Sequence, residues 1–114
     1  MKEILFVCIA AVSRSPTGAR VFNENFERDG LRTKYTAHFV AAMDKLPRSI
    51  MQHDIDRAYM IIPVKSDVTK AIAEQGLNLP SEKRLELMIP DVYERDDEEL
   101  IRIFNLVYEE GFWR

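Results

Sequence analysis

The sequence predicts a small doubly wound α/β domain, in which a four-stranded parallel sheet is flanked by helices. Strand-like and helix-like segments alternate along the chain, as they do in parallel α/β sheets. No internal repeat, low-complexity tract or linker interrupts this alternation. A chain of 114 residues is long enough to bury one hydrophobic core. We therefore expect residues 1–114 to form a single domain.

The first two elements are a strand and a long helix. The apolar segment Lys2–Val7 reads as a strand. Ser15 is the expected N-cap of the helix, and Pro16 takes its first position, where the missing N–H group costs nothing. Apolar residues at helical spacing extend this helix towards Arg28, and Gly30 ends it.

The remaining elements repeat the alternation. In order, they are predicted as a strand over residues 34–42, a short helix after Pro47 that includes Ile50 and Met51, a strand over 57–62, a helix over 66–75, a strand over 83–88 and a last helix. The strand over 57–62 reads as a buried central strand ended by Pro63. Asp96 and Glu99 form a pair like a capping box at the start of the last helix.

Composition and charge exclude several classes of protein. The content of 46% hydrophobic and 31% charged residues is typical of soluble globular proteins. No apolar run is long enough to span a membrane, and the first residues do not form a signal peptide. A net charge of −3 gives no reason to expect nucleic acid or an anionic membrane as partner. The single cysteine excludes an intrachain disulfide and a cysteine-rich metal site, so we expect a cytoplasmic protein.

No metal or cofactor is expected. His38 and His53 lie far apart in the sequence, without partners at the spacing of metal ligands. Surface or strand positions are therefore the better interpretation of both histidines.

The segment from Cys8 to Pro16 predicts an anion site. Cys8 follows the first strand, which is expected to be central, and ligands of doubly wound sheets bind beyond the carboxyl ends of such strands. The following loop leads to a helix N-terminus, where N–H groups and the helix dipole attract anions and stabilise a thiolate. Arg14 offers a planar guanidinium for two phosphate oxygens, and Ser15 offers its hydroxyl to the sulfur. The predicted phosphate-binding residues are Ile9, Ala10, Ala11, Val12, Ser13 and Arg14.

Cys8 also has a simpler interpretation. A free cysteine at the end of a strand is often an inert buried residue that packs like a small hydrophobe. Arg14, Ser15 and Pro16 in register after it favour a nucleophile instead.

The series Cys8-x5-Arg14-Ser15-Pro16-Thr17, placed after an Ile-Leu-Phe-Val strand, resembles the low-molecular-weight protein tyrosine phosphatases. The short predicted phosphatases of that superfamily are the most similar. The order of strands and helices extends the resemblance over most of the chain, but the specific motifs lie in residues 4–22 and 89–93. The resemblance implies hydrolysis of phosphomonoesters through a phosphocysteine intermediate, without a metal or cofactor.

The resemblance also implies a general acid on a loop near the carboxyl end of the chain. Asp91 stands at the matching place, although Pro90 precedes it, whereas the family commonly has the order Asp-Pro. Tyr93 resembles the aromatic residues that wall the substrate cleft of the family. Asp96 and Asp97 are weaker candidates for the acid, because helix capping explains them.

Two departures from the family pattern affect the loop. The family usually has a Gly-Asn pair two and three places after the nucleophile, where this chain has Ala10 and Ala11. Alanine enters the left-handed conformation reluctantly and has no amide to bond across the loop, so we expect a looser or differently routed loop and slower catalysis. Many members have a second cysteine just before the arginine, where this chain has Ser13, so an oxidised Cys8 lacks that rescue.

Three functions are compatible with the sequence. The first is a phosphomonoesterase that acts on a phosphorylated protein or a small aryl phosphate. The second is a catalytically weak relative that only binds a phosphorylated partner, which the altered loop favours. The third is arsenate reduction, which related enzymes perform through further cysteines; this chain has none and would need an external thiol.

Overall fold

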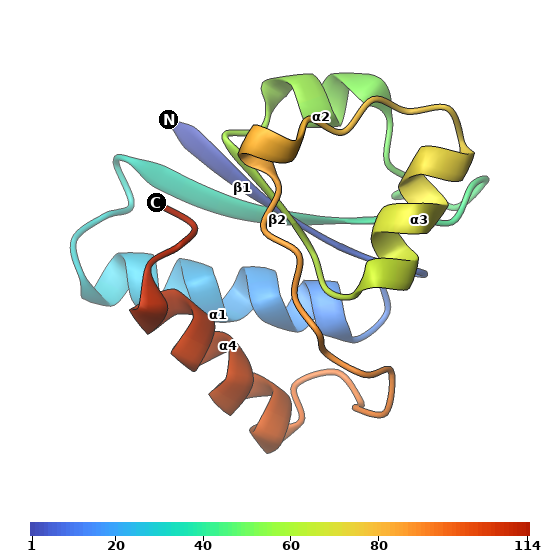
Figure 1. Cartoon of the computed structure of the whole chain (residues 1–114). Helices are drawn as coiled ribbons and strands as arrows, with labels where there is room; N and C mark the ends of the chain where they lie inside the picture. Colours follow the sequence, from blue (N-terminus) through green and yellow to red (C-terminus); the bar gives the residue numbers. More distant parts are fainter.

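The computed structural model describes residues 1–114 and contains a three-stranded parallel sheet with helices on both sides (Figure 1). The strands lie in the order β2-β1-β3, with these bounds: β1 Lys2–Cys8, β2 Tyr35–Ala41 and β3 Met60–Pro63. The helices are α1 Arg14–Arg28, α2 Gln52–Arg57, α3 Ser66–Glu74 and α4 Glu98–Glu110, with a 3-10 turn at Ser81–Lys83. No helix has the length and apolar character that crossing a membrane requires.

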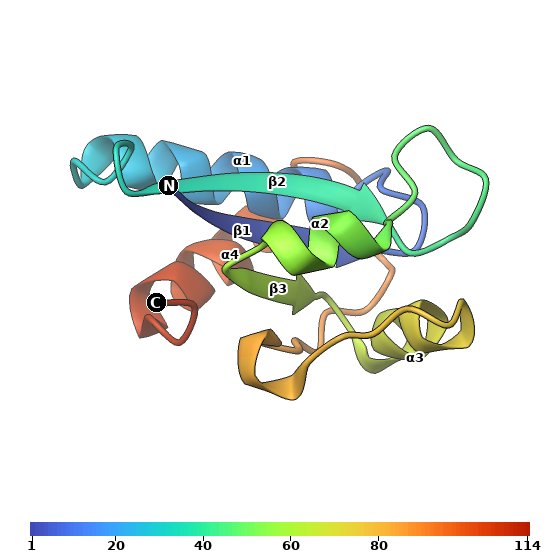
Figure 2. The same cartoon turned by 90° about the horizontal axis from the view of Figure 1, so that it is seen from above.

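The arrangement of the layers confirms the doubly wound α/β class. Helices α1 and α4 pack together against one face of the sheet, whereas α2 and α3 lie on the other side (Figures 1 and 2). Strand β1 is central, as expected, and the chain continues to β2 on one side of it and to β3 on the other. The carboxyl end of β1 is therefore the point where the strand order reverses, and in such sheets a crevice opens there.

The predicted fourth strand over residues 83–88 is wrong. This segment runs beside β3, and its N–H groups donate hydrogen bonds in one direction, from Leu85 to the Ile61 carbonyl (2.8 Å) and from Leu87 to the Pro63 carbonyl (2.9 Å). Only one isolated parallel bridge, between Ile61 and Arg84, joins the two segments. Pro63 has no N–H group and cannot return a bond, so a regular ladder does not form. Strand β3 is consequently the edge of the sheet and not a central strand.

Two helix ends differ in how well the sequence predicted them. The C-terminus of α1 is as predicted: Gly30 adopts a φ of 70°, and the Leu31 N–H donates to the Phe26 carbonyl at 2.7 Å, as in a Schellman motif. The short helix begins later than predicted, at Gln52, because the Ile50 N–H donates to the Ala41 carbonyl at 2.8 Å and Met51 is still extended.

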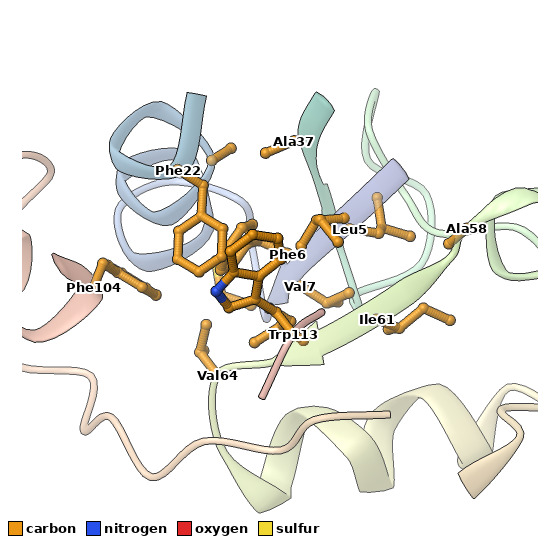
Figure 3. Close-up of a cluster of buried hydrophobic side chains, with 14 of the residues drawn as sticks. Leu5, Phe6, Val7, Phe22, Ala37, Ala58, Ile61, Val64, Phe104 and Trp113 are labelled. Atoms are coloured by element: carbon orange, nitrogen blue, oxygen red, sulfur yellow. The ribbon is translucent and has the colours of Figure 1, made fainter. Parts of the chain in front are cut away.

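An aromatic cluster fills the space between the sheet, α1 and α4 (Figure 3). Trp113 is fully buried, and its ring packs against Phe22, Phe26 and Tyr108 with centroid distances of 5.1 to 5.6 Å. Its indole N–H donates to the Tyr108 carbonyl at 2.8 Å, so the polar atom of this ring is satisfied. Burial of such a large side chain contributes about 1.5–3 kcal/mol to folding, so Trp113, next to the last residue, is part of the core.

The first turns of α1 lie unusually close to β1 and α4. Gly18 permits this approach, because a Cβ atom there would lie 2.8 Å from the Phe6 ring and 2.9 Å from the Phe104 ring. Both rings are fully buried and cannot move aside. The helix that begins at the predicted anion site is thus fixed rigidly to the centre of the sheet.

Candidate active site

Cys8 is the last residue of β1 and lies at the point where the strand order reverses. Its carbonyl accepts the Ala42 N–H at 2.8 Å, and the Ile9 carbonyl accepts the Met43 N–H at 2.9 Å. The chain that follows β2 therefore anchors the base of the loop after Cys8. This anchoring fixes the direction in which the loop leaves the sheet.

The loop contains one strained residue. Ala11 has a φ of 57°, in the left-handed region that residues with a Cβ atom avoid. The sequence raised the possibility of a different loop path because Ala10 and Ala11 replace a Gly-Asn pair. The left-handed turn is present nevertheless, and it is made by an alanine.

The Cys8 thiol contacts the Ser15 hydroxyl, with 2.9 Å between Sγ and Oγ. The prediction that Ser15 caps the helix is wrong: α1 already begins at Arg14, and Ser13 is its N-cap without a side-chain bond. Because Ser15 is fully buried and its hydroxyl faces the sulfur, it is not available to cap the helix N-terminus. Ser15 therefore contacts the thiol and does not cap the helix.

Arg14 is buried beside the thiol, with only 2% of its side chain exposed. Its Nη1 donates to the Ile89 carbonyl at 2.8 Å, whereas Nε is buried and has no hydrogen-bond partner. The nearest carboxylate oxygen, Oδ1 of Asp91, lies 3.7 Å from Nε. A buried cation with an unsatisfied donor is costly, and an anion bound at this place would satisfy it.

A cavity of about 300 Å³ brings most of the predicted site residues together. Its lining consists of Cys8, Ile9, Ala10, Val12, Ser13, Arg14 and Asp91. Ala11 and Ser15 do not line it. Asp91 stands at the rim with 72% of its side chain exposed, on the segment that follows the irregular residues beside β3.

Tyr93 is not among the residues that line this cavity. Its side chain is half-buried and packs against the hydrophobic core. The exposed apolar side chains near the cavity are aliphatic instead: Val12 in the loop and Val92 next to Asp91. Sequence reasoning had named Val12 only as part of the phosphate-binding loop and had missed Val92, because nothing in the local pattern separates such a residue from an ordinary exposed one. It also missed the Ile89 carbonyl, a main-chain group for which the sequence carries no signal.

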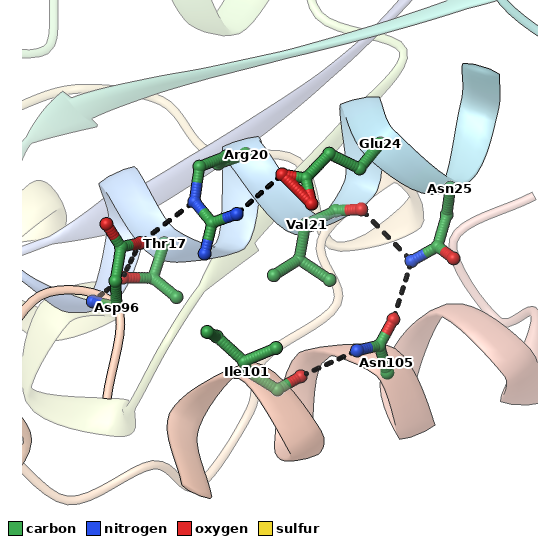
Figure 4. A network of polar contacts seen from close by, with 8 residues as sticks. All are labelled: Thr17, Arg20, Val21, Glu24, Asn25, Asp96, Ile101 and Asn105. Atoms are coloured by element: carbon green, nitrogen blue, oxygen red, sulfur yellow. Dashed lines mark hydrogen bonds and ion pairs between the residues drawn. The ribbon is translucent and has the colours of Figure 1, made fainter. Parts of the chain in front are cut away.

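Asp96 does not take part in capping α4, contrary to the sequence-based expectation. Asp97 is the N-cap, and its Oδ1 accepts the Glu99 N–H at 2.9 Å. Asp96 instead contacts Thr17 and Arg20 on α1 (Figure 4).

No three His, Cys, Asp or Glu side chains converge at metal-binding distance anywhere in the chain. Both histidines are exposed, as predicted; His38 lies 3.3 Å from Glu3, and His53 lies 3.4 Å from Asp54. The site at the end of β1 is therefore built from a thiol, a guanidinium, a helix N-terminus and one carboxylate.

The largest cavity of the molecule, about 610 Å³, lies elsewhere, between α1 and the outer edge of β2. Asn23 covers part of this edge, because its side chain accepts the Ala37 N–H at 2.9 Å and donates to the Ala37 carbonyl at 3.0 Å. The cavity contains four arginines, of which Arg20 and Arg32 are already paired with carboxylates. Cys8 and Arg14 do not line this cavity, so it is separate from the predicted site.

Neither a protein-family model nor a curated protein sequence matches the chain. Several solved structures do. A low molecular weight protein tyrosine phosphatase from Streptococcus pyogenes aligns over 98% of this chain and 93% of its own, with 19% identity and a TM-score of 0.75. A protein tyrosine phosphatase from Entamoeba histolytica aligns over 97% of both chains, with 18% identity and a TM-score of 0.74.

A third structure, Wzb from Vibrio vulnificus in complex with benzylphosphonate, aligns over 95% of this chain and 92% of its own. Its identity is 16% and its TM-score 0.66. At such identities the likeness concerns the fold, and it covers nearly the whole chain. The chain therefore has the fold of the low-molecular-weight protein tyrosine phosphatases.

Proposed function

We propose that this protein is a cysteine-dependent phosphomonoesterase of the protein tyrosine phosphatase kind, with residues 1–114 as one phosphatase-like domain. The observation that carries the proposal is the buried Arg14, which has an unpaired Nε and lines the same cavity as Cys8. A guanidinium in this position stabilises a phosphoryl group and the negative charge of its transition state. The fold shared with phosphatases supports the same reaction.

The reaction has two steps. In the first, the Cys8 thiolate attacks phosphorus, the bond to the ester oxygen breaks, and Asp91 donates a proton to the leaving oxygen. In the second, Asp91 takes a proton from water, which attacks phosphorus and releases inorganic phosphate and the thiolate. The Ser15 hydroxyl, 2.9 Å from the sulfur, stabilises the thiolate as nucleophile and as leaving group. The N–H groups of the loop over residues 9–13 bind the phosphoryl oxygens.

The substrate is a phosphorylated protein or a small aryl phosphate. Val12 lines the cavity and is 66% exposed, and Val92, the neighbour of Asp91 in the chain, is 75% exposed. An apolar group bearing the phosphate would cover such side chains. The benzylphosphonate bound to Wzb has this combination of an anion and an aromatic ring. A net charge of −3 favours neither nucleic acid nor a membrane surface as partner, and the single cysteine favours the cytoplasm.

A binding module for phosphate or phosphopeptides is the second candidate. The strained Ala11 favours it, because this residue has no side-chain amide to bond across the loop and must be held at a φ of 57° by its neighbours. Such a loop can bind an anion, but it positions the phosphoryl group less precisely for attack, so hydrolysis is slow.

The decisive experiment is a rapid-quench search for phosphate attached to Cys8, with p-nitrophenyl phosphate as substrate and a chelator present. We expect a phosphoenzyme and steady turnover in the unaltered protein and neither in Cys8→Ser. Asp91→Asn should lower kcat/KM by a factor of about 10² or more for a substrate with a poor leaving group, such as phenyl phosphate, and much less for p-nitrophenyl phosphate. Asp97→Asn is the matched control, because asparagine remains a good N-cap and Asp97 lies outside the cavity.

The alternatives give different results. Tight binding of phosphate without turnover would favour the binding module. Oxidation of added glutathione that depends on arsenate, in a protein without phosphatase activity, would indicate arsenate reduction. Turnover that survives Cys8→Ser would overturn the proposal.

A further inference from the structure

Helix α1 contacts the segment that carries Asp91 at two places. Three residues of α1, spaced three apart as neighbours on a helix surface, make these contacts. Arg14 donates through Nη1 to the Ile89 carbonyl at 2.8 Å, at the beginning of the segment. Thr17 and Arg20 contact Asp96, at its end (Figure 4).

The contact at Asp96 consists of three interactions. The Asp96 N–H donates to Oγ1 of Thr17 at 2.9 Å, and this hydroxyl lies 3.4 Å from the Asp96 carboxylate. Nε of Arg20 donates to the same carboxylate oxygen at 2.9 Å. Thr17 is fully buried, so its hydroxyl is available to Asp96 and not to solvent.

Asp96 is strained where these interactions hold it. Its φ is 62°, a left-handed conformation that costs a residue other than glycine about 1 kcal/mol or more. The residue does not cap α4, because Asp97 performs that function. Strain of this kind persists only when surrounding contacts impose it.

Asp91 itself has little to hold it. Its side chain is 72% exposed, and the 3.7 Å approach to Arg14 is its only polar contact. Its position over the Cys8 cavity is therefore set by the path of the main chain between Ile89 and Asp96. Three contacts fix that path: the bond from Arg14 to the Ile89 carbonyl, the packing of Tyr93 against the core, and the bonds that join Asp96 to α1.

We infer that Thr17 and Asp96 are positioning residues that hold the Asp91 carboxylate at the rim of the Cys8 cavity. This inference rests on the proposed function, in which Asp91 is the general acid. Thr17 and Asp96 touch neither the substrate nor the thiol and act through the main chain. An ordinary helix-to-loop contact would contribute to stability but would not influence proton donation to the leaving group.

The test compares Thr17→Val with the unaltered protein on two substrates. Valine has the shape of threonine but leaves the Asp96 N–H without its acceptor. Phenyl phosphate has a leaving group of pKa about 10, like that of tyrosine, and depends strongly on general acid help. The leaving group p-nitrophenol is far more acidic and depends on it little. Because misplacement of a catalytic group by about 1 Å costs up to about 10²-fold, we expect kcat/KM for phenyl phosphate, which reports formation of the phosphoenzyme, to fall at least tenfold. The kcat/KM for p-nitrophenyl phosphate should fall less than threefold, and inhibition by inorganic phosphate should not change.

Two further variants and one control complete the test. Thr17→Ser retains the hydroxyl and should restore the activity on phenyl phosphate. Asp96→Gly accepts the left-handed φ but loses the carboxylate, and should show the same preference for good leaving groups even if Thr17→Val folds poorly. Thr69→Val is the matched control, because the Thr69 hydroxyl on α3 is buried without a partner.

An equal loss of kcat/KM on both substrates, or no loss on either, would overturn the positioning inference while leaving the phosphatase proposal intact. If the unaltered protein formed no phosphoenzyme and turned over neither substrate, both the proposed function and this inference would be wrong.

Discussion

The Sγ atom of Cys8 lies 2.9 Å from the Oγ atom of Ser15, although the two residues belong to different elements, β1 and α1. Both side chains are buried, so water does not compete for this contact. The hydroxyl can donate to a thiolate, and a hydrogen bond to a charged group is stronger than one between neutral groups.

Ser15→Ala should reduce the reactivity of Cys8. A hydrogen bond to a charged group contributes about 1.5–3 kcal/mol, so we expect alkylation of the thiol by iodoacetamide at neutral pH to slow by about tenfold or more. Phosphatase turnover should fall with it. Ser81→Ala, on the exposed 3-10 turn, is the control and should react like the unaltered protein. Unchanged alkylation in Ser15→Ala would show that the thiol does not depend on this hydroxyl.

Inorganic phosphate should stabilise the protein through Arg14. A ligand present at about 100 times its Kd adds about 2.7 kcal/mol to the free energy of unfolding, which a thermal melt detects as a rise in Tm. Arg14→Lys keeps the charge but loses the planar fork, so most of this rise should disappear. Arg28→Lys, at the far end of α1, should retain it. The same rise in both variants would mean that phosphate binds somewhere other than the Cys8 cavity.

Replacement of Ala11 by glycine should raise the free energy of unfolding. The left-handed φ of 57° costs an alanine about 1–2 kcal/mol, and a glycine there avoids this cost but adds about 0.4–1 kcal/mol of unfolded-state entropy. We therefore expect Ala11→Gly to raise the free energy of unfolding in urea by about 0.5–1 kcal/mol. Ala10→Gly should lower it, because Ala10 is not left-handed and gains no relief. Destabilisation by both substitutions would mean that the turn at Ala11 is not strained.

Stability should depend on pH through Asp29 and Tyr108 at the junction of α1 and α4. Hydrogen bonds from Arg28, and then from Tyr108, lower the pKa of Asp29 from 3.8 to about 2. Burial, together with the bond to Asp29, raises the pKa of Tyr108 from 10.0 to about 12. The contribution of Asp29 is therefore complete above pH 3.8 and is lost as the pH falls towards 2. That of Tyr108 is complete below pH 10 and is lost as the pH rises towards 12.

Tyr108→Phe tests this dependence in unfolding experiments across the pH range. The loss of stability between pH 10 and 12 should become smaller, and the acid loss should shrink because one donor to Asp29 is gone. Tyr35→Phe is the control, since Tyr35 is a half-buried tyrosine whose ring stacks on Phe26. A Tyr108→Phe variant with the alkaline profile of the unaltered protein would contradict the assignment.

The fold followed from the sequence wherever a local signal decided it. The apolar run of β1, the helical spacing of α1 and the glycines after α1 and α3 each determine structure through the residues next to them. The prediction of a fourth strand was wrong, because residues 83–88 have a pattern typical of a strand but lie beside β3, which cannot form a regular ladder with them. Pro63 in β3 withholds the N–H group that a ladder needs, and this matters only once the two segments lie side by side.

For the candidate site, the sequence determined by itself what lies within a few residues: a thiol at the end of a strand, a guanidinium and a hydroxyl at the start of a helix. The tertiary structure alone decided that Ser15 faces Cys8 instead of capping its helix and that Arg14 is buried with a free Nε. It alone decided that Thr17 contacts Asp96, 79 positions away, and that Tyr93 packs against the core and does not line the cavity. Covalent proximity restricts what a side chain can reach locally, whereas contacts between distant segments depend on how the whole core packs them together.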